Sequence, residues 1–253
     1  MSTQWIRPDW PAPAGVRALI TTRAGGVSRG PYGAPPRDRD GMNIGLGSGD
    51  DSADVTKNRA LLRAHLPADP RWLNQVHGAV VVEAAQPEAT TTADASFTTA
   101  PNVVCVVSIA DCMPVLFADA SGRCVGVAHA GWRGLAAGVI QATAKAMRKH
   151  LGSDGAELLA YLGPAIGPRH FEVGAEVLDA MQASLPQAGR AFAAQPNGKY
   201  LADLFILGQQ ALEQAGVARV YGGRDCTFSD PARFYSFRRS RVTGRHAALI
   251  WRV

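Results

Sequence analysis

The longest apolar run in this 253-residue chain is Val103 to Val107, which Ser108, Ile109 and Ala110 extend. It is far shorter than the roughly 18 apolar residues that indicate a membrane-spanning helix. Its continuous apolar character is typical of a strand that other layers cover on both faces. The sequence therefore predicts a buried strand inside a globular domain and no membrane partner.

Composition supports an ordinary globular protein. Hydrophobic residues make up 47% of the chain and charged residues 19%, which excludes the low-hydrophobicity, high-charge class of disordered proteins. The 27 Gly and 16 Pro have no period, so they punctuate many short elements. A single domain over residues 1–253 is expected, because this length is near the upper limit for one hydrophobic core.

Hydrophobic periodicity predicts a mixture of helices and strands. Helices are expected over 55–65, 135–151, 173–184 and 201–215, and a loop over 23–28. Strands are expected over 16–22, 72–77, 80–83, 103–109, 115–119, 124–129, 158–162, 217–221 and 247–253, with 115–119 and 124–129 forming a hairpin. There is no regular β-α-β rhythm, so the fold class is α+β or mixed α/β.

Charge and cysteine content narrow the function further. The net charge is +5, but the basic residues are spread along the chain, so nucleic-acid binding is not expected. The first eight residues lack a basic start followed by an apolar segment, which predicts a cytoplasmic protein. Four Cys are too few for a disulfide framework. In the reducing cytoplasm, metal binding or catalysis is a more common use of a thiol than a disulfide.

Three ligand-type side chains, His77, Cys112 and His129, lie at the ends of expected strands. Loops at strand ends are where such a scaffold exposes reactive groups. Two imidazoles and one thiolate leave the fourth tetrahedral position open, as in a catalytic zinc site. The separations of 35 and 17 residues match no zinc-finger pattern, so core His and a buried Cys are the competing interpretation.

The segments around these residues carry long motifs. They are Thr21-Thr22-Arg23-x-Gly25-Gly26-Val27-Ser28, Asn74-Gln75-Val76-His77-Gly78, Ala110-Asp111-Cys112-x-Pro114 and His129-Ala130-Gly131-Trp132-Arg133-Gly134. Together they resemble the laccase-domain family of purine nucleoside phosphorylases, also described as polyphenol oxidases and as the bacterial peptidoglycan editing factor. Further motifs follow in the expected order over nearly the whole chain: Gly163-Pro164-Ala165-Ile166-Gly167-Pro168, Phe171-Glu172-Val173-Gly174, Cys226-Thr227 and Ser236-Phe237-Arg238-Arg239.

The resemblance implies a fold, a metal and a reaction. The fold would be a four-layer α/β/β/α sandwich of mixed sheets. His77, Cys112 and His129 would bind zinc, with copper as the alternative. The activities would be phosphorolysis of adenosine, inosine and methylthioadenosine and hydrolytic deamination of adenosine, which makes a purine nucleoside and phosphate the expected partners. The oligomeric state is not predicted.

Substrate-binding and catalytic candidates follow from what these reactions need. Arg23, beside two glycines and Ser28, combines a guanidinium with backbone donors suited to phosphate, although it could instead pair with a surface carboxylate. Arg133 and Arg238 are reserve candidates. Asp111 is the nearest group for proton transfer, with Glu172 and Asp225 as further acids. Asn43 and Gln75 lie at family-like positions and are expected to face the substrate, whereas Trp132 is expected to pack in the core.

Two departures from the family pattern concern the pocket edge. The stretch 33–41 is longer than usual, and Phe171 stands where Tyr is more common, which removes one hydroxyl.

Three alternative functions would use the same residues. Cys112 with His77 or His129 as base would make a metal-free hydrolase of amides or peptides, such as cell-wall precursors. Copper at the same ligands would give a polyphenol oxidase, although one mononuclear site is a poor platform for four-electron oxygen reduction. A binding module without turnover would also keep the ligands and the pocket.

Overall fold

The computed structural model describes residues 5–86, 91–153 and 156–253. The predicted central strand is β6 (Val104–Ile109), which lies in a four-stranded sheet of order β1-β14-β6-β3. The other members are β1 (Val16–Ile20), β14 (His246–Arg252) and β3 (Pro70–Arg71). β14 runs antiparallel to β1 and β6, whereas β3 runs parallel to β6, so this sheet is mixed.

A second, six-stranded sheet has the order β13-β9-β7-β8-β5-β4. Its members are β13 (Arg219–Gly222), β9 (Leu158–Leu162), β7 (Met113–Asp119), β8 (Val125–Ala130), β5 (Ala95–Thr98) and β4 (Val81–Glu83). The predicted hairpin is present, because β7 and β8 pair antiparallel from Met113 opposite Ala130. β13 and β9 pair parallel, as do β4 and β5, so the second sheet is also mixed.

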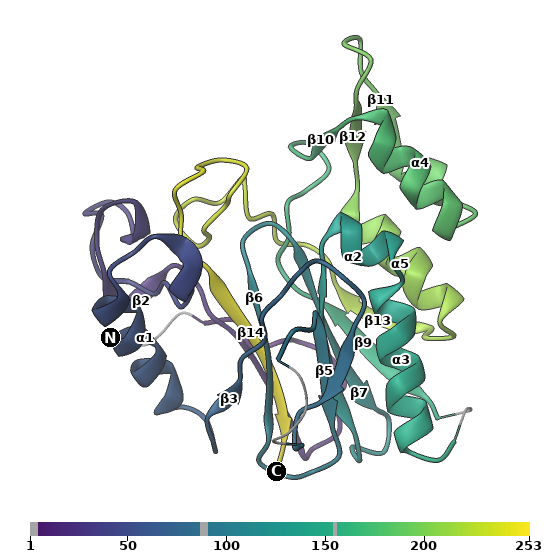
Figure 1. Cartoon of the computed structure of the whole chain (residues 1–253), viewed down its shortest axis with the longest axis horizontal. Helices are drawn as coiled ribbons and strands as arrows, with labels where there is room; N and C mark the ends of the chain where they lie inside the picture. The colour runs from purple at the N-terminus through teal and green to yellow at the C-terminus, as the bar shows by residue number, and fades with distance from the viewer. Residues whose placement is uncertain (1–4, 87–90, 154–155) are drawn as a thin grey trace.

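Helices cover the outer face of each sheet (Figure 1). α1 (Ser52–Arg63) begins at the predicted cap Asp51, whose side chain accepts the N–H of Ala53, and it covers the four-stranded sheet. The six-stranded sheet is covered by α2 (Trp132–Ala136), α3 (Val139–His150), α4 (Ala175–Ser184) and α5 (Leu204–Gln214).

Three apolar clusters fill the spaces between these layers. The first, between the two sheets, includes Ile20, Val107 and Leu116. The second lies under α1 and includes Leu62 and Leu249, and the largest lies under helices α2 to α5. The expected α/β/β/α sandwich of mixed sheets is therefore confirmed.

Several short elements were not predicted. A three-stranded sheet of order β10-β12-β11 stands at the top of Figure 1, formed by β10 (Glu172–Val173), β12 (Tyr200–Ala202) and β11 (Phe192–Ala194). Residues 24–28, expected as a loop, form strand β2 (Ala24–Ser28). The described residues also form the 3-10 helices η1 (Gly30–Tyr32), η2 (Leu46–Ser48) and η3 (Ala188–Ala191).

Two expected elements were wrong for identifiable reasons. The single helix over 135–151 is divided into α2 and α3, because Gly138 adopts a φ of 82°, a left-handed conformation that a helix interior cannot contain. The strand over 72–77 does not form. There the side chain of Gln75 replaces a strand ladder, accepting the N–H of Ser108 at 2.7 Å and donating to its carbonyl at 2.9 Å. In the described part of the chain, no helix has both the length and the apolar character needed to cross a membrane.

Candidate metal centre

His77, Cys112 and His129 come from three separate segments of the chain and lie close together. His77 lies on the loop between β3 and β4, Cys112 on the turn between β6 and β7, and His129 near the end of β8. Their ligand atoms all lie within 4.8 Å of one another, and Sγ of Cys112 is 3.9 Å from Nε2 of His77. A tetrahedral zinc ion with ordinary bond lengths holds S and N ligands about 3.6 Å apart. The set could therefore hold one ion after small shifts of the side chains.

The centre is open on one side. The side chain of His129 is 4% exposed, Cys112 is half-buried and His77 is exposed. Gly131 follows His129 closely and packs against the thiol, since a Cβ at this glycine would lie 2.7 Å from Sγ of Cys112. The buried side is thus closed by backbone, and the exposed side would give water or substrate access to a bound ion.

Both loops that carry the outer two ligands contain unusual backbone. His77 has a φ of 60° and Asp111, just before Cys112, has a φ of 87°. Such conformations cost free energy for residues other than glycine and persist only where neighbouring contacts hold them. For Asp111 those contacts are the hydroxyl of Thr227, which donates to Oδ1 at 2.6 Å, and the backbone N–H of Arg238, which donates to Oδ2 at 2.7 Å.

Asp94 organises the centre from beneath and was missed by the sequence analysis. It is fully buried, and Oδ1 lies 2.9 Å from Nδ1 of His129. Its carboxylate also accepts the backbone N–H groups of Val76, His77 and Gly78 at 3.1, 2.9 and 2.7 Å. The bond at Nδ1 leaves Nε2 of His129 free to face an ion.

Protonation in the centre favours a thiolate. Burial raises the pKa of the Cys112 thiol, but the charge and hydrogen bonds of His129 and His77 lower it further, to about 6. Burial lowers the pKa of His129, and the negative charges of Cys112 and Asp94 raise it above its ordinary value. For Asp94, burial acts to raise the pKa, yet its hydrogen bonds with His129 and the backbone hold it below the usual value. A thiolate is the form of cysteine that binds metal.

Two of the predicted substrate residues share one cavity. A cavity of about 480 Å³ is lined by Arg133, Arg238 and Trp132, together with residues of β10, α4 and Lys199. Trp132 also packs against the largest apolar cluster, as expected, and the guanidinium of Arg133 lies 4.4 Å from its ring. The buried ring of Phe171 lies under Arg238 at 5.4 Å. Trp132 directly follows Gly131, whose backbone packs against Cys112, although none of the three ligands lines this cavity.

The remaining predicted residues are engaged in structural contacts. Nε of Arg23 donates to the carbonyl of Gly33 at 2.7 Å, and its other nitrogens donate to two more carbonyls. Ser28 and Asn43 are fully buried, and each donates to Oδ2 of Asp50, at 2.7 and 2.9 Å. Gln75 is bonded to the backbone of β6, as described above. Their contact with substrate stays a prediction.

Arg245 is a second residue that the sequence analysis missed. It immediately precedes β14, and its backbone N–H donates to Oδ1 of Asn43 at 2.8 Å. Burial lowers the pKa of its guanidinium, and the neighbouring charges of Cys112 and Asp111 raise it. A positive charge therefore lies at the edge of the metal centre.

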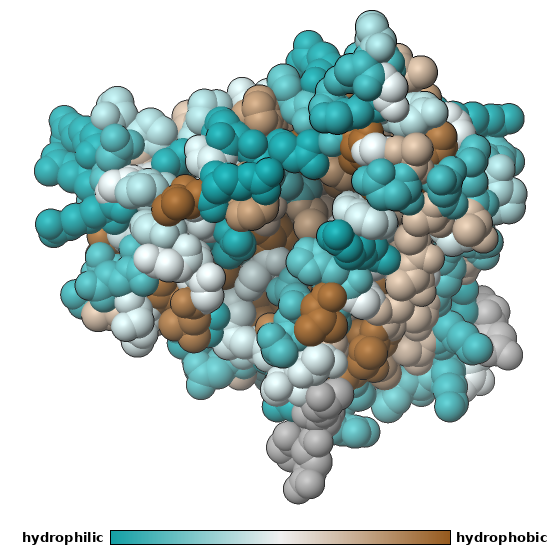
Figure 2. All heavy atoms as spheres, turned by 45° about the horizontal axis from the view of Figure 1, so that its top comes forward, coloured by the Kyte–Doolittle hydropathy of each residue, from teal (hydrophilic) through white to brown (hydrophobic). Residues whose placement is uncertain are grey.

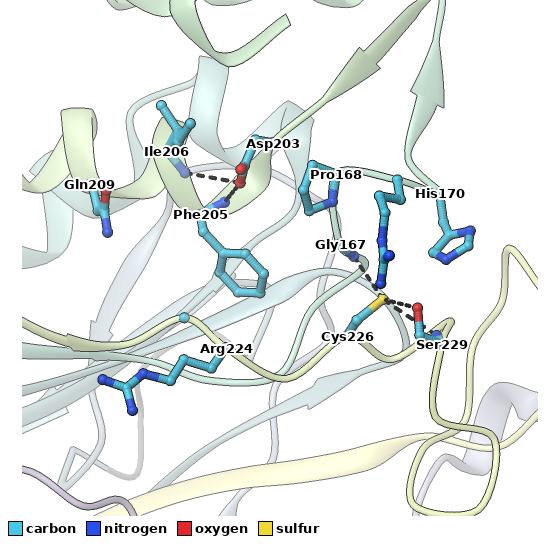
Figure 3. Close-up of a pocket in the computed structure, with 12 residues that line it drawn as sticks. Gly167, Pro168, His170, Asp203, Phe205, Ile206, Gln209, Arg224, Cys226 and Ser229 are labelled. Atoms are coloured by element: carbon cyan, nitrogen blue, oxygen red, sulfur yellow. Dashed lines mark hydrogen bonds between the residues drawn. The ribbon is translucent and has the colours of Figure 1, made fainter. Parts of the chain in front are cut away.

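A different cavity, of about 390 Å³, is lined by residues that include His170, Asp203 and Cys226 (Figure 3). On its wall Sγ of Cys226 accepts hydrogen bonds from the N–H of Gly167 at 3.2 Å and from the N–H and hydroxyl of Ser229 at 3.4 and 3.2 Å. Neither the candidate ligands nor any of the predicted substrate residues line this cavity, so we do not assign the chemistry to it.

Figure 2 is turned so that the top of the molecule in Figure 1 comes toward the reader. Hydrophilic residues cover most of this face, and hydrophobic side chains gather in small groups between them (Figure 2). The large exposed hydrophobic side chains of the described residues include Val76 and Val80, on either side of His77, and Phe237. Such a face suits a small polar ligand with one apolar part.

Comparisons with known proteins agree with this geometry. Residues 17–253 match the family described as multi-copper polyphenol oxidoreductase laccase. The chain belongs to this family. A purine nucleoside phosphorylase of Pseudomonas aeruginosa is 52% identical over 248 residues, which is 98% of each chain. Purine nucleoside phosphorylase YfiH of Escherichia coli is 46% identical over 252 residues, again 98% of each chain.

Solved structures place the same family on this fold. The Neisseria meningitidis protein NMB0706, of the family DUF152, superposes with a TM-score of 0.89 at 46% identity, over 98% of each chain. YlmD of Geobacillus stearothermophilus superposes with a TM-score of 0.87 at 33% identity, over 100% of this chain and 97% of its own. The laccase-like family and its sandwich fold, both expected from the motifs, are confirmed.

Proposed function

We propose that this chain is a zinc-dependent purine nucleoside phosphorylase that acts on adenosine, inosine and methylthioadenosine and also deaminates adenosine. The observation that carries the proposal is the meeting of His77, Cys112 and His129, and the cavity lined by Arg133 and Arg238 is the proposed substrate site. The names of the relatives support the phosphorylase reaction. The cavity, at about 480 Å³, is within the usual size range of small-molecule sites.

The donor set fits zinc. Two imidazoles and one thiolate with an open side match the ligands of catalytic zinc sites. Asp94 supports the fit, because a carboxylate on the far nitrogen of a ligating imidazole fixes its orientation and raises its basicity. When bound, zinc would supply a Lewis acid that polarises an oxygen ligand and lowers the pKa of a bound water.

Phosphorolysis exchanges one bond for another. An oxygen of hydrogen phosphate forms a bond to C1′ of the ribose while the bond from C1′ to the purine nitrogen breaks. The proton of hydrogen phosphate ends on the departing base, so the products are free base and ribose 1-phosphate. The chain's part is to hold the nucleoside, to hold the anion beside it and to exclude competing water.

The cavity residues suit the nucleoside. Trp132 offers an aromatic face in this cavity, and Arg133 and Arg238 offer donors for ribose or anion oxygens. Asp111 is the proposed proton-transfer group, because its carboxylate lies next to Cys112 in the chain and is 8% exposed. Its two hydrogen bonds hold it in one orientation, as a general acid or base requires.

A specific contact favours a second candidate. Sγ of Cys112 lies 3.9 Å from Nε2 of His77, and its pKa is lowered to about 6, which are properties of a nucleophilic cysteine with a base. A metal-free Cys-His hydrolase of amides or peptides would use the same atoms. Copper in place of zinc would favour the polyphenol oxidation that the family description names.

Products and metal content distinguish these functions. The proposed function predicts about one zinc per chain and free base from adenosine only when phosphate is present. Cys112→Ala should lose most of the zinc, whereas Cys105→Ala, at a fully buried position in β6, should keep it and cost about 1 kcal/mol of stability. Formation of inosine from adenosine in the absence of phosphate would indicate the deaminase reaction. Peptide cleavage with nucleosides untouched, or phenol oxidation that requires copper, would replace the proposal.

A further inference from the structure

Phosphorolysis needs a cation whose hydrogen-bond donors the protein does not itself use, because the phosphate is an anion that must be held beside the ribose. Arg23 is the arginine that the sequence motif predicts to bind phosphate. Its Nε, Nη1 and Nη2 each donate to a backbone carbonyl, at 2.7 to 3.3 Å. Its guanidinium therefore holds the loop around Gly33 and the segment at Pro231 together. An incoming anion would have to compete with these three bonds.

Two other arginines, Arg238 and Arg239, are engaged by backbone carbonyls, whereas the side chain of Arg133 forms no hydrogen bond with the described residues. Arg239 donates to three backbone carbonyls at 2.5 to 2.9 Å. Nη1 of Arg238 donates to the carbonyl of Glu172 at 2.6 Å. Arg133 is exposed and stacks on Trp132.

Arg245 occupies a different position. β14 begins with His246, which pairs with Ile109 of β6. Because the two strands are antiparallel, Arg245 lies beside the segment that follows Ile109 and leads to Cys112. The stem of Arg245 crosses Gly45 so closely that a Cβ there would lie 2.6 Å from its Cγ. Together with the bond from its backbone N–H to Asn43, this fixes the direction of the side chain.

The guanidinium of Arg245 is only partly used. Nη1 donates to the carbonyls of Thr243 and Gly244, both at 3.0 Å, and Cζ lies 5.7 Å from the ring centre of Phe237. Within residues 5–86, 91–153 and 156–253, no carboxylate forms an ion pair with it and no acceptor bonds to Nε or Nη2. These two groups lie on one edge of the guanidinium, which is the edge that grips two oxygens of a phosphate.

On the basis of the proposed function, we infer that Arg245 binds the phosphate co-substrate through Nε and Nη2, with Phe237 supporting the guanidinium. The charges of Cys112 and Asp111 act on this half-buried cation without forming an ion pair with it, so a bound phosphate would be its direct charged partner. Asn43 and Gly45 then act as positioning residues for Arg245. Arg23 is assigned to the structure of the loops instead.

The test compares conservative variants of the full-length, metal-loaded protein. Arg245→Gln should raise the apparent KM for phosphate about 10- to 100-fold, the loss expected for charge-assisted hydrogen bonds, while the KM for adenosine and the zinc content stay within about twofold. Arg241→Gln is the matched control, because Arg241 is exposed and lies 4.9 Å from the same Phe237 ring. It should leave the KM for phosphate unchanged. Arg23→Gln should lower Tm without changing the KM for phosphate.

A binding measurement separates this inference from the proposed function. Inorganic phosphate should raise the Tm of the wild-type protein, and Arg245→Gln should abolish that shift, whether or not the protein turns over nucleosides. An unchanged KM and an unchanged Tm shift in Arg245→Gln would overturn the inference, as would a loss in Arg23→Gln alone. Should Arg245→Gln fail to fold, Arg245→Lys keeps the charge but removes the two-donor edge and should show the same direction of change. Absence of phosphorolysis with an intact Arg245-dependent shift would overturn only the proposed function.

Discussion

Nδ1 of His129 lies 2.9 Å from Oδ1 of Asp94, and the same oxygen accepts the backbone N–H of His77 at 2.9 Å. One fully buried carboxylate thus connects two of the three candidate metal ligands. The loop that carries His77 has no strand to hold it, so Asp94 takes over that role. The orientation of the His129 imidazole and the position of the His77 backbone therefore depend on one side chain outside the ligand set.

Replacing Asp94 should weaken metal binding without removing a ligand. Asp94→Asn keeps the size of the side chain but loses the negative charge that supports His129, and such changes commonly reduce metal affinity about 10- to 100-fold. The measurement is zinc affinity by competition with a chromogenic chelator.

Asp119→Asn is the control for this prediction. Asp119 is also a buried carboxylate, 3% exposed, and it accepts a hydrogen bond from the hydroxyl of Ser121 at 2.5 Å. It lies at the opposite end of β7 from Cys112. Its variant should lose stability and keep zinc affinity, and equal affinities in both variants would contradict the role given to Asp94.

Gly131 should tolerate no side chain. In Gly131→Ala the new Cβ would lie 2.7 Å from Sγ of Cys112 and 3.3 Å from Cδ2 of His77, so the thiol must move. Because the φ of Gly131 is −69°, backbone strain does not contribute. We expect at least about a tenfold loss of zinc affinity, since misplaced ligands bind metal poorly. Gly47→Ala, where a Cβ would have no neighbour within 4 Å, should bind zinc normally.

Metal binding should release protons in a predictable pH window. Cys112, with a pKa of about 6, is already a thiolate above that pH, whereas His129, with its raised pKa, still carries a proton that an ion must displace. Between about pH 6 and the raised pKa of His129, these two groups should therefore release about one proton per zinc. Below about pH 6 the thiol is protonated as well, so release increases and affinity falls more steeply. Calorimetry in buffers of different ionisation enthalpy measures the number directly, and proton release independent of pH from 5 to 8 would contradict it.

Much of the fold was predictable because its signals are local. The apolar run of β6, the alternating strands of the β7–β8 hairpin and the Asp51 cap of α1 each lie within a few residues. The break at Gly138 was not predictable in the same way, since an isolated glycine inside a helical pattern is often tolerated.

The site shows the same division. His77, Cys112 and His129 were found because their residue types indicate metal chemistry and the motifs are specific. Asp94 and Arg245 were missed because their roles depend on contacts with segments that are distant in the sequence. Asp94 precedes β5, yet it bonds to the loop before β4 and to β8. The backbone of Arg245 bonds to Asn43, 202 residues away. An Asp or Arg in a turn carries no such information in its neighbours.

Asn58 should prove to be the residue on which the loop behind Arg245 depends. It is fully buried on α1, donates through Nδ2 to the hydroxyl of Ser28 at 2.9 Å and to the carbonyls of Gly41 and Asn43 at 3.1 and 2.8 Å, and accepts the N–H of Val27 at 2.8 Å. Asn58→Ala leaves these buried groups without partners, which should lower the free energy of unfolding by about 2 to 4 kcal/mol. Urea denaturation measures this.

The exposed Asn197, replaced by Ala, is the matched control and should cost less than about 1 kcal/mol. Since Asn43 holds the backbone of Arg245, loosening it through Asn58 should also weaken phosphate binding while the zinc ligands keep their affinity. If Asn58→Ala were as stable as Asn197→Ala, the loop would not depend on the Asn58 contacts. If it were destabilised but bound phosphate normally, Asn43 would not position Arg245.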